Sequence, residues 1–325
     1  FGGTLSMYEA THDVKYLERA LAWAETMVSK ATIIDSNGNH NWSGPWSSPY
    51  STTPIAYQLD DLQGSTELAR LANIILTNPT LKSSYGSRGT AIYTFVRDQI
   101  LNKHLFTRGG LHWFRDEVVH TTRNMNDKAA LLIRVLRDVY LTSASLGSAD
   151  NSTYNYPDIL IELAQGFKGR FQPYQGGLIW DKGLGNYGPI PPNDPTTFMD
   201  TSHANRFLFA LVDLYEAGIV FTKDDVVGVS ALLTNVIWNQ SLADPRFTNF
   251  IDGTNYPALN KTEWGLGQIY SGWVVLAEFD SQVLQVADAT LKTMLAGVAN
   301  PSLDSIDNLH GRIALSGHLA KAVAQ

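Results

Sequence analysis

Apolar residues recur every three or four positions through most of this chain of 325 residues, as they do along amphipathic helices. The pattern is strongest over residues 126–142, where Ala129, Leu132, Ile133 and Leu136 fall on one face. No stretch shows the alternation of a strand, and no strand–helix–strand rhythm occurs. The sequence therefore predicts an all-α fold.

The predicted helices come in pairs. Residues 4–30 break near residues 11–13, which gives a short helix, a turn and a longer helix. A second pair opens at Pro54, a residue that suits a first helical position, and runs to about Leu76. The remaining helices are expected at 86–105, 126–142, 157–171, within 198–218, and at 222–238, 281–296 and 309–323. Residues 34–53, 172–199 and 239–261 are predicted to be loops.

About ten or eleven helices with irregular spacing do not fit a bundle with short loops. A ring of hairpins explains them better, because neighbours then cover each inner helix and the long loops meet at one cleft. We expect residues 1–325 to form one catalytic domain, a closed or incomplete (α/α) toroid of about five to seven hairpins. A superhelical repeat stack is the alternative, but no strict repeat period is found.

Charge and composition exclude several classes of protein. The net charge is −7, with 24 Lys and Arg against 31 Asp and Glu and no basic run, so neither nucleic acid nor a membrane surface is an expected partner. There is no cysteine, and no metal-ligand spacing or phosphate-binding glycine loop occurs. We therefore expect no cofactor and no metal.

Four N-glycosylation sequons, at Asn41, Asn151, Asn239 and Asn260, favour a secreted glycoprotein. We expect this protein to be a monomer.

The segment 198–218 carries the first group of candidate functional residues. His203 and Arg206 lie three residues apart on one predicted helix that Asp200, Thr201 or Ser202 can cap and Gly218 can end. The imidazole and the guanidinium then share one face near the positive end of the helix dipole. The alternative is a capping or core histidine beside an outward salt-bridging arginine.

Two further segments combine polar groups with predicted helix ends. Arg123, Asn124 and Asn126 precede a strongly apolar helix, where either asparagine could instead be an N-cap. The segment around Trp264 and Tyr270 holds three glycines in a helical pattern. Either a ligand approaches the backbone closely there, or two helices pack through the glycines.

Aromatic side chains suggest contacts with sugar rings. Trp42, Trp46 and Tyr50 lie in a predicted loop, where they could also form a lid over the core. Trp113 is close to Arg115, which could pair with a ligand carboxylate or with Asp116 or Glu117.

Amide, guanidinium, imidazole and phenol groups suit β-elimination from a polymer of uronic acids. The sugar carboxylate must first lose its charge to hydrogen-bond donors, after which a base removes the neighbouring proton. The motifs Arg-Asn-Met-Asn at 123–126, Asp-Thr-Ser-His-Ala-Asn-Arg at 200–206 and Gly-Gln-Ile-Tyr at 267–270 carry these groups. In a ring of αα-hairpins this set resembles the alginate-lyase-like polysaccharide lyases, which include glucuronan and alginate lyases built on α/α toroids.

The resemblance implies a role for each residue. Asn124 and His203 would neutralise the substrate carboxylate with support from Arg206, and Tyr270 would be the base, the acid or both. Asn126, Arg123 and Arg115 would bind the acidic polysaccharide, and sugar rings would stack on Trp113, Trp264, Trp42 and Trp46.

Two other classes stay open. A glycoside hydrolase on the same toroid would need two carboxyl groups, one of them protonated. Its candidates are Asp60, Asp61, Asp116, Glu117, Asp200 and Glu263. A non-catalytic sugar-binding protein would show affinity without cleavage.

Overall fold

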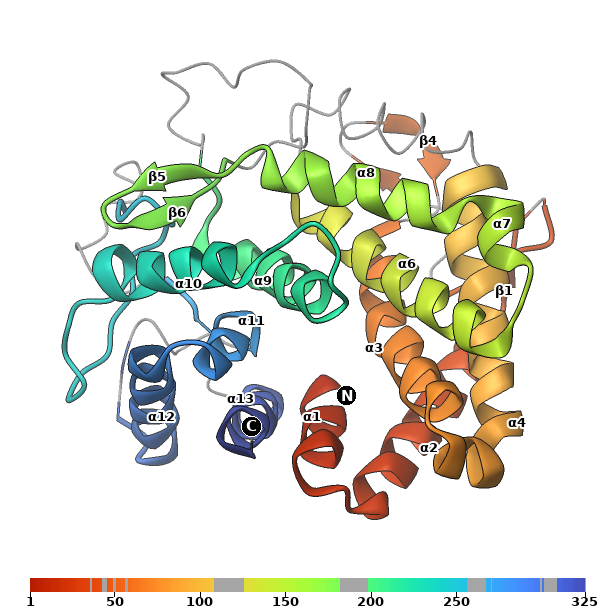
Figure 1. The fold of residues 1–325 in the computed structure, drawn as a ribbon, viewed down its shortest axis with the longest axis horizontal. Helices are drawn as coiled ribbons and strands as arrows, with labels where there is room; N and C mark the ends of the chain where they lie inside the picture. Colours follow the sequence, from red (N-terminus) through yellow and green to blue (C-terminus); the bar gives the residue numbers. More distant parts are fainter. Residues whose placement is uncertain are drawn as a thin grey trace. The chain divides into compact units, whose positions relative to one another are not determined.

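The computed structural model describes residues 1–35, 37–42, 46–48, 51–55, 58–107, 126–181, 198–255, 267–269, 271–298, 300 and 309–324. Helices make up most of these ranges, which confirms the all-α class (Figure 1). The chain divides into two compact units: unit 1 comprises Phe1–Leu17 and Ala164–Gln325, and unit 2 comprises Glu18–Leu163. The single catalytic domain over 1–325 stays a prediction.

Unit 2 is built mainly from α3 and the helices that pack on it, α4 and α6 (Figure 1). Its buried side chains include Leu68, Leu71, Ile92 and Ile133. Two strand pairs, β1–β2 and β3–β4, precede α3. The first and last helices of this part of the chain, α2 and α8, extend into unit 1. Its elements are α2 (Val14–Lys30), β1 (Ile33–Ile34), β2 (His40–Asn41), β3 (Trp46–Ser48), β4 (Ser51–Ile55), α3 (Gln58–Thr77), α4 (Pro79–Phe95), η1 (Val96–Leu101), η2 (Lys103–Thr107), α6 (Asn126–Leu146), α7 (Asp150–Tyr154) and α8 (Tyr156–Lys168).

The prediction that Pro54 begins a helix is wrong. Pro54 lies in strand β4, and α3 begins at Gln58. Proline disfavours a helical conformation in the residue before it, and Thr52 and Thr53 are themselves strand formers. The predicted loop 34–53 contains two strand pairs, and the helix predicted to reach 105 changes to π-helical turns after Phe95.

Unit 1 brings the first and last helices of the chain together. Figure 1 shows α1 beside α13, and the two pack against each other. Their backbones touch, because a Cβ atom on Gly3 would lie 2.7 Å from the carbonyl oxygen of Ile313. The elements of unit 1 are α1 (Gly2–Thr11), β5 (Gln172–Tyr174), β6 (Gly177–Ile179), α9 (Thr201–Glu216), α10 (Lys223–Leu232), η3 (Leu233–Ile237), α11 (Ser271–Val274), η5 (Val275–Glu278), α12 (Ser281–Leu295) and α13 (Leu309–Ala324).

Several predicted helix ends are confirmed. α1 ends where His12 adopts a left-handed φ of 55°, and Gly218 has a φ of 68° after α9. Thr222 and Asp225 form a reciprocal capping box at the start of α10. The predicted loop from 172 instead opens with the hairpin β5–β6, whose turn residues Gln175 and Gly176 both have positive φ.

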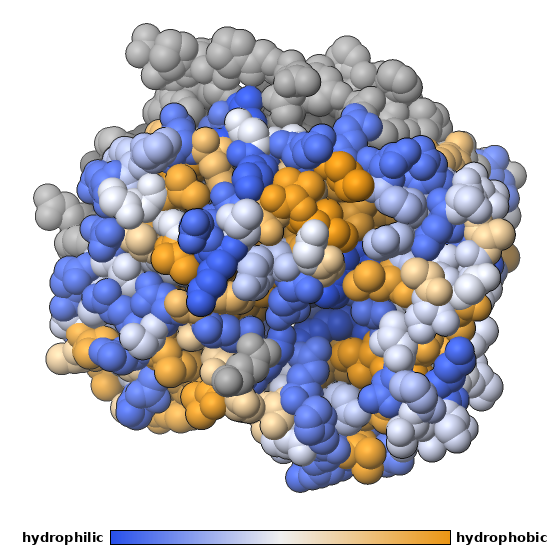
Figure 2. Space-filling view, in the orientation of Figure 1, coloured by the Kyte–Doolittle hydropathy of each residue, from blue (hydrophilic) through white to orange (hydrophobic). Residues whose placement is uncertain are grey.

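On the face drawn in Figure 2, hydrophobic residues form small groups among hydrophilic ones. Within the described ranges, no helix has the length and apolar character needed to cross a bilayer.

Candidate functional site

One carboxylate fixes both the start of α9 and the ring of His203. Oδ1 of Asp200 accepts the backbone N–H of His203 at 2.9 Å, and Oδ2 accepts from Nδ1 of the same residue at 2.6 Å. A carboxylate accepts hydrogen bonds, so the proton on Nδ1 points towards Asp200. In the neutral ring Nε2 is then the nitrogen that can take up a proton.

The dyad is partly exposed, with 39% of the His203 side chain and 29% of the Asp200 side chain accessible. Burial acts to raise the pKa of Asp200, but the hydrogen bonds and charge of His203 outweigh it and hold the pKa below its usual value. Asp200 therefore stays ionised and stabilises a protonated imidazole. A carboxylate and an imidazole in this order have the chemistry to act as a general base.

Aromatic packing on its buried face holds helix α9, which carries this dyad, in place. Phe207, one turn after His203, is fully buried and stacks on Trp180 at 4.4 Å and on Phe167 at 5.0 Å. Arg206 is partly exposed and lies one turn after His203. Asp200 is the cap, and His203 is neither the cap nor a buried core residue. The functional roles of His203 and Arg206 stay predictions.

Asn205 joins α9 to residues 268–273, which also belong to unit 1. Its Nδ2 donates to the carbonyl oxygen of Gln268 at 3.1 Å, and its Oδ1 accepts N–H groups from Gly272 at 3.0 Å and Trp273 at 3.2 Å. Thr201 adds a contact, since its Oγ1 accepts the N–H of Gln268 at 2.9 Å. The start of α9 and the residues on both sides of position 270 are therefore joined in one hydrogen-bond network.

Two glycines of this segment, Gly267 and Gly272, allow the chain to pack closely on itself. A Cβ atom on Gly272 would lie 2.0 Å from the carbonyl oxygen of Asn205, and one on Gly267 would lie 1.8 Å from that of Thr248. The sequence left two reasons open for these glycines, a ligand close to the backbone or packing of the chain through them, and the contacts of Gly267 and Gly272 agree with packing. For these two, the approaching group is the protein's own backbone.

Most of the other predicted site residues fall outside the side chains that the structure describes. Tyr270, Asn124, Arg123, Trp113, Arg115 and Trp264 lie outside the described residues, as do the hydrolase candidates Asp116, Glu117 and Glu263. Asn126 begins α6 and Trp46 begins β3, but only their backbones are described.

Trp42 is described and is held by packing within unit 2. Its Nε1 donates to the carbonyl oxygen of Met27 at 2.7 Å, and its ring is tilted against Phe95 at 5.6 Å. This geometry favours the alternative that Trp42 covers the core. Its stacking on a sugar stays a prediction.

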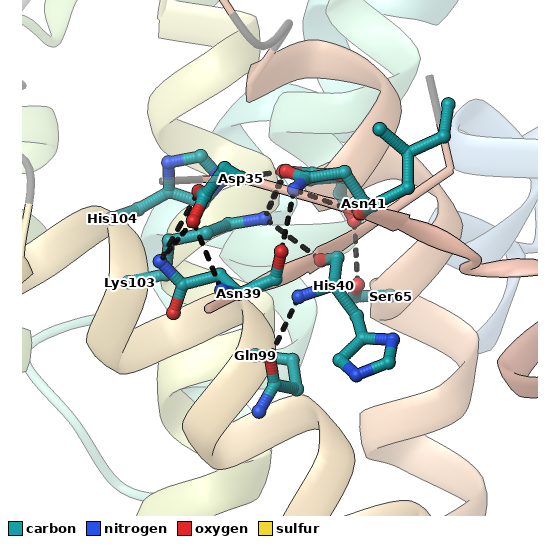
Figure 3. A network of polar contacts seen from close by, with 10 residues as sticks. Asp35, Asn39, His40, Asn41, Ser65, Gln99, Lys103 and His104 are labelled. Carbon is teal, nitrogen blue, oxygen red and sulfur yellow. Dashed lines mark hydrogen bonds and ion pairs between the residues drawn. The ribbon is translucent and has the colours of Figure 1, made fainter. Parts of the chain in front are cut away.

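Unit 2 contains a buried charged cluster that sequence reasoning missed (Figure 3). Nζ of Lys103 donates to Oδ2 of Asp61 at 2.6 Å and to Oδ1 of Asn41 at 2.9 Å, while Nε2 of His104 contacts the same oxygen of Asp61 at 3.0 Å. All three ionisable side chains are at most 2% exposed. The available signal was a Lys-His pair between the apolar residues Leu101 and Leu105, where a solvated helix face is not expected.

The cluster anchors β2 and defines the state of Asp61. Burial acts to raise the pKa of Asp61, but hydrogen bonding to His104 and the charge of Lys103 outweigh it, so the net shift is downward. An ionised, enclosed Asp61 does not fit the protonated acid of a hydrolase. His40 adds to the same structure, since its backbone N–H donates to Oε1 of Gln99 at 2.8 Å (Figure 3).

The asparagine side chains of the three described sequons are buried or hydrogen-bonded within the protein. Asn41 is 2% exposed, Asn151 donates to the carbonyl oxygen of Tyr140 at 3.1 Å, and Asn239 donates to that of Asp244 at 2.9 Å. Glycosylation stays a prediction, and Asn260 lies outside the described residues.

In the described part of the chain, no three histidine, aspartate or glutamate side chains are placed to hold a metal ion. No family model, curated protein or solved structure matches the chain.

Proposed function

We propose that the protein is a secreted, monomeric polysaccharide lyase that cleaves a uronic-acid-containing polymer, of the glucuronan or alginate type, by β-elimination. The observation that carries the proposal is the Asp200–His203 dyad, a partly exposed base beside the guanidinium-bearing Arg206 on one helix. No external redox partner or activated group is needed for this reaction, since a base, an acid and a charge-neutralising group suffice.

In the proposed reaction, the carboxylate of a uronate residue lies near Arg206 and the start of α9, where the guanidinium and the helix dipole favour an anion. Nε2 of His203 removes the proton from C5, and Asp200 stabilises the imidazolium that forms. The electron pair of the C5–H bond becomes the C4–C5 double bond, and the C4–O bond breaks. The leaving oxygen takes a proton from an acid, for which Tyr270 is the candidate.

The dyad changes one expected role. His203 was expected to help neutralise the substrate carboxylate, but its contact with Asp200 suits a base better. The role of Tyr270 as the acid is proposed from its sequence motif, since this residue lies outside the described ranges. The role of Asn124 is proposed from its sequence motif alone.

The proposal includes the architecture. A closed or incomplete (α/α) toroid of about five to seven hairpins accounts for the helix pairs predicted from the sequence. Pairs of consecutive helices that pack together within one unit, such as α3 with α4 and α12 with α13, support it.

The reaction is tested by its product. Incubation with glucuronan, alginate, pectate and glycosaminoglycans, followed at the ultraviolet absorbance of the unsaturated uronate, should show growth on at least one polymer, and that growth should be lost in His203→Ala. New reducing ends without the chromophore would instead establish the glycoside hydrolase. Binding without new chain ends would establish a non-catalytic sugar-binding protein.

A further inference from the structure

A buried carboxylate in unit 1 has more negative than positive neighbours. Lys321 on α13 lies between three carboxylates, with Nζ at 3.6 Å from Glu278, 3.5 Å from Glu216 and 3.7 Å from Glu9. If all four groups are ionised, the cluster carries a net charge of −2. The ammonium of Lys321 is thus shared among three carboxylates.

The three carboxylates differ in their access to water. Glu9 and Glu216 are 26% and 33% exposed, so water screens their charges. Glu278 is 3% exposed, and its Oε2 is buried without a hydrogen-bond partner among the described residues. An ionised carboxylate with an unsatisfied buried oxygen is costly, whereas a proton on that oxygen removes the charge.

The charges that act most strongly on Glu278 are those of Lys321, Glu216 and Glu9. Of the other elements packed against η5, α9 also carries Arg206 and Asp213, and α13 also carries Arg312. On α10, Asp225 pairs with Lys168, and on α12, Asp288 pairs with Lys292 near solvent. The remaining charged residues of α10, Lys223 and Asp224, are exposed, and α11 carries no titratable side chain. His318 on α13 is one turn before Lys321 and bonds Ser6 on α1 at 3.0 Å.

We propose that Glu278 is a proton-binding site whose ionisation weakens the attachment of the first helix of the chain to the last. The cluster joins α1 through Glu9, α9 through Glu216 and α13 through Lys321, and α1 packs directly on α13 (Figure 1). Protonation of Glu278 leaves a net charge of −1 at a junction where the backbones of Gly3 and Gly317 touch. Ionisation adds a charge there that water cannot reach.

The direction of the titration agrees with this geometry. Burial raises the pKa of Glu278, and the charges of Glu216 and Glu9 add to the rise, while Lys321 opposes it. A group whose folded pKa is above its unfolded value contributes stability that is present below the unfolded pKa and lost as pH rises through the folded pKa.

The test compares the wild-type chain with Glu278→Gln, which keeps the shape of the side chain and removes its charge. Thermal unfolding is followed from acid to neutral pH. We expect the two unfolding temperatures to agree in acid, and the variant to become the more stable protein as pH rises. The matched control Asp288→Asn removes an exposed carboxylate of unit 1 and should show no such divergence.

Hydrogen exchange locates the effect, since α1 and α13 should exchange faster at neutral than at acid pH, relative to the intrinsic rate, in the wild type and not in Glu278→Gln. A constant gap between the two proteins at every pH would overturn the proposal. If Glu278→Gln fails to fold, the carboxyl carbon of Glu278 in the wild-type chain can be titrated by NMR. A pKa at or below that of an exposed glutamate would then overturn the proposal, and a raised one would support it.

Discussion

The carboxylate of Asp200 holds the backbone and the ring of His203 at once, at 2.9 Å and 2.6 Å. An N-cap aspartate commonly satisfies only backbone N–H groups. Here the second oxygen fixes the ring orientation as well, so the fold of the helix start and the chemistry of the histidine depend on the same residue.

Asp200→Asn should separate these two contributions. The amide oxygen can still cap α9, but the residue no longer carries a negative charge to stabilise a protonated His203. We expect turnover on the responsive polyuronate to fall by about 10²- to 10⁴-fold with a smaller change in KM, because the charge matters most in the transition state. The measurement is the rate of ultraviolet absorbance growth.

Circular dichroism and the unfolding temperature provide the control for Asp200→Asn, since both should stay close to those of the wild type. A variant with full turnover would show that the charge of Asp200 is not used. Because the pKa of Asp200 is lowered, its carboxylate stays ionised to lower pH than an ordinary aspartate, so the charge removed in Asp200→Asn is present throughout the neutral range.

Helix ends were predictable because their signals are local. Thr222 and Asp225 satisfy each other three residues apart, and Gly218 adopts the left-handed conformation that ends α9. The position of His203 and Arg206 on one helix also followed from spacing alone. These predictions needed no information about distant parts of the chain.

Contacts between distant residues were not predictable in the same way. Asp61 and Lys103 are 42 positions apart, and no local pattern indicates that they pair. The pairing of Asp200 with His203 was missed as well, although an aspartate three residues before a histidine at a helix start permits it. The strand at Pro54 was missed because proline suits both a first helical position and an extended segment.

Lys103→Met should strongly destabilise unit 2. The substitution removes the ammonium that donates to Asp61 and Asn41 and leaves a carboxylate that is 2% exposed. Breaking a buried ion pair in this way costs about 3–5 kcal/mol, which chemical denaturation would measure. Lys292→Met removes an exposed lysine, 74% accessible, and should cost about 1 kcal/mol or less.

The pH dependence gives a second check on this cluster. The folded pKa of Asp61 is lowered, so its contribution to stability is present above the unfolded pKa and lost as pH falls through the folded pKa. The stability difference between wild type and Lys103→Met should therefore shrink in acid. A difference that stays constant down to the acid transition would mean that packing, and not charge, holds the cluster.

Glycine substitutions test how closely α9 and α11 approach. A Cβ atom on Gly272 would lie 2.0 Å from the carbonyl oxygen of Asn205, a backbone atom that can move only with its helix. Gly272→Ala should therefore displace the start of α11, lower the unfolding temperature and reduce turnover through the loss of the Asn205 hydrogen bonds. Gly86 on α4 is the matched control, since its nearest neighbour is a flexible side-chain atom of Lys82 at 3.5 Å. Gly86→Ala should stabilise the protein by about 0.5–1 kcal/mol, because alanine costs less entropy in a helix interior, and should leave turnover unchanged.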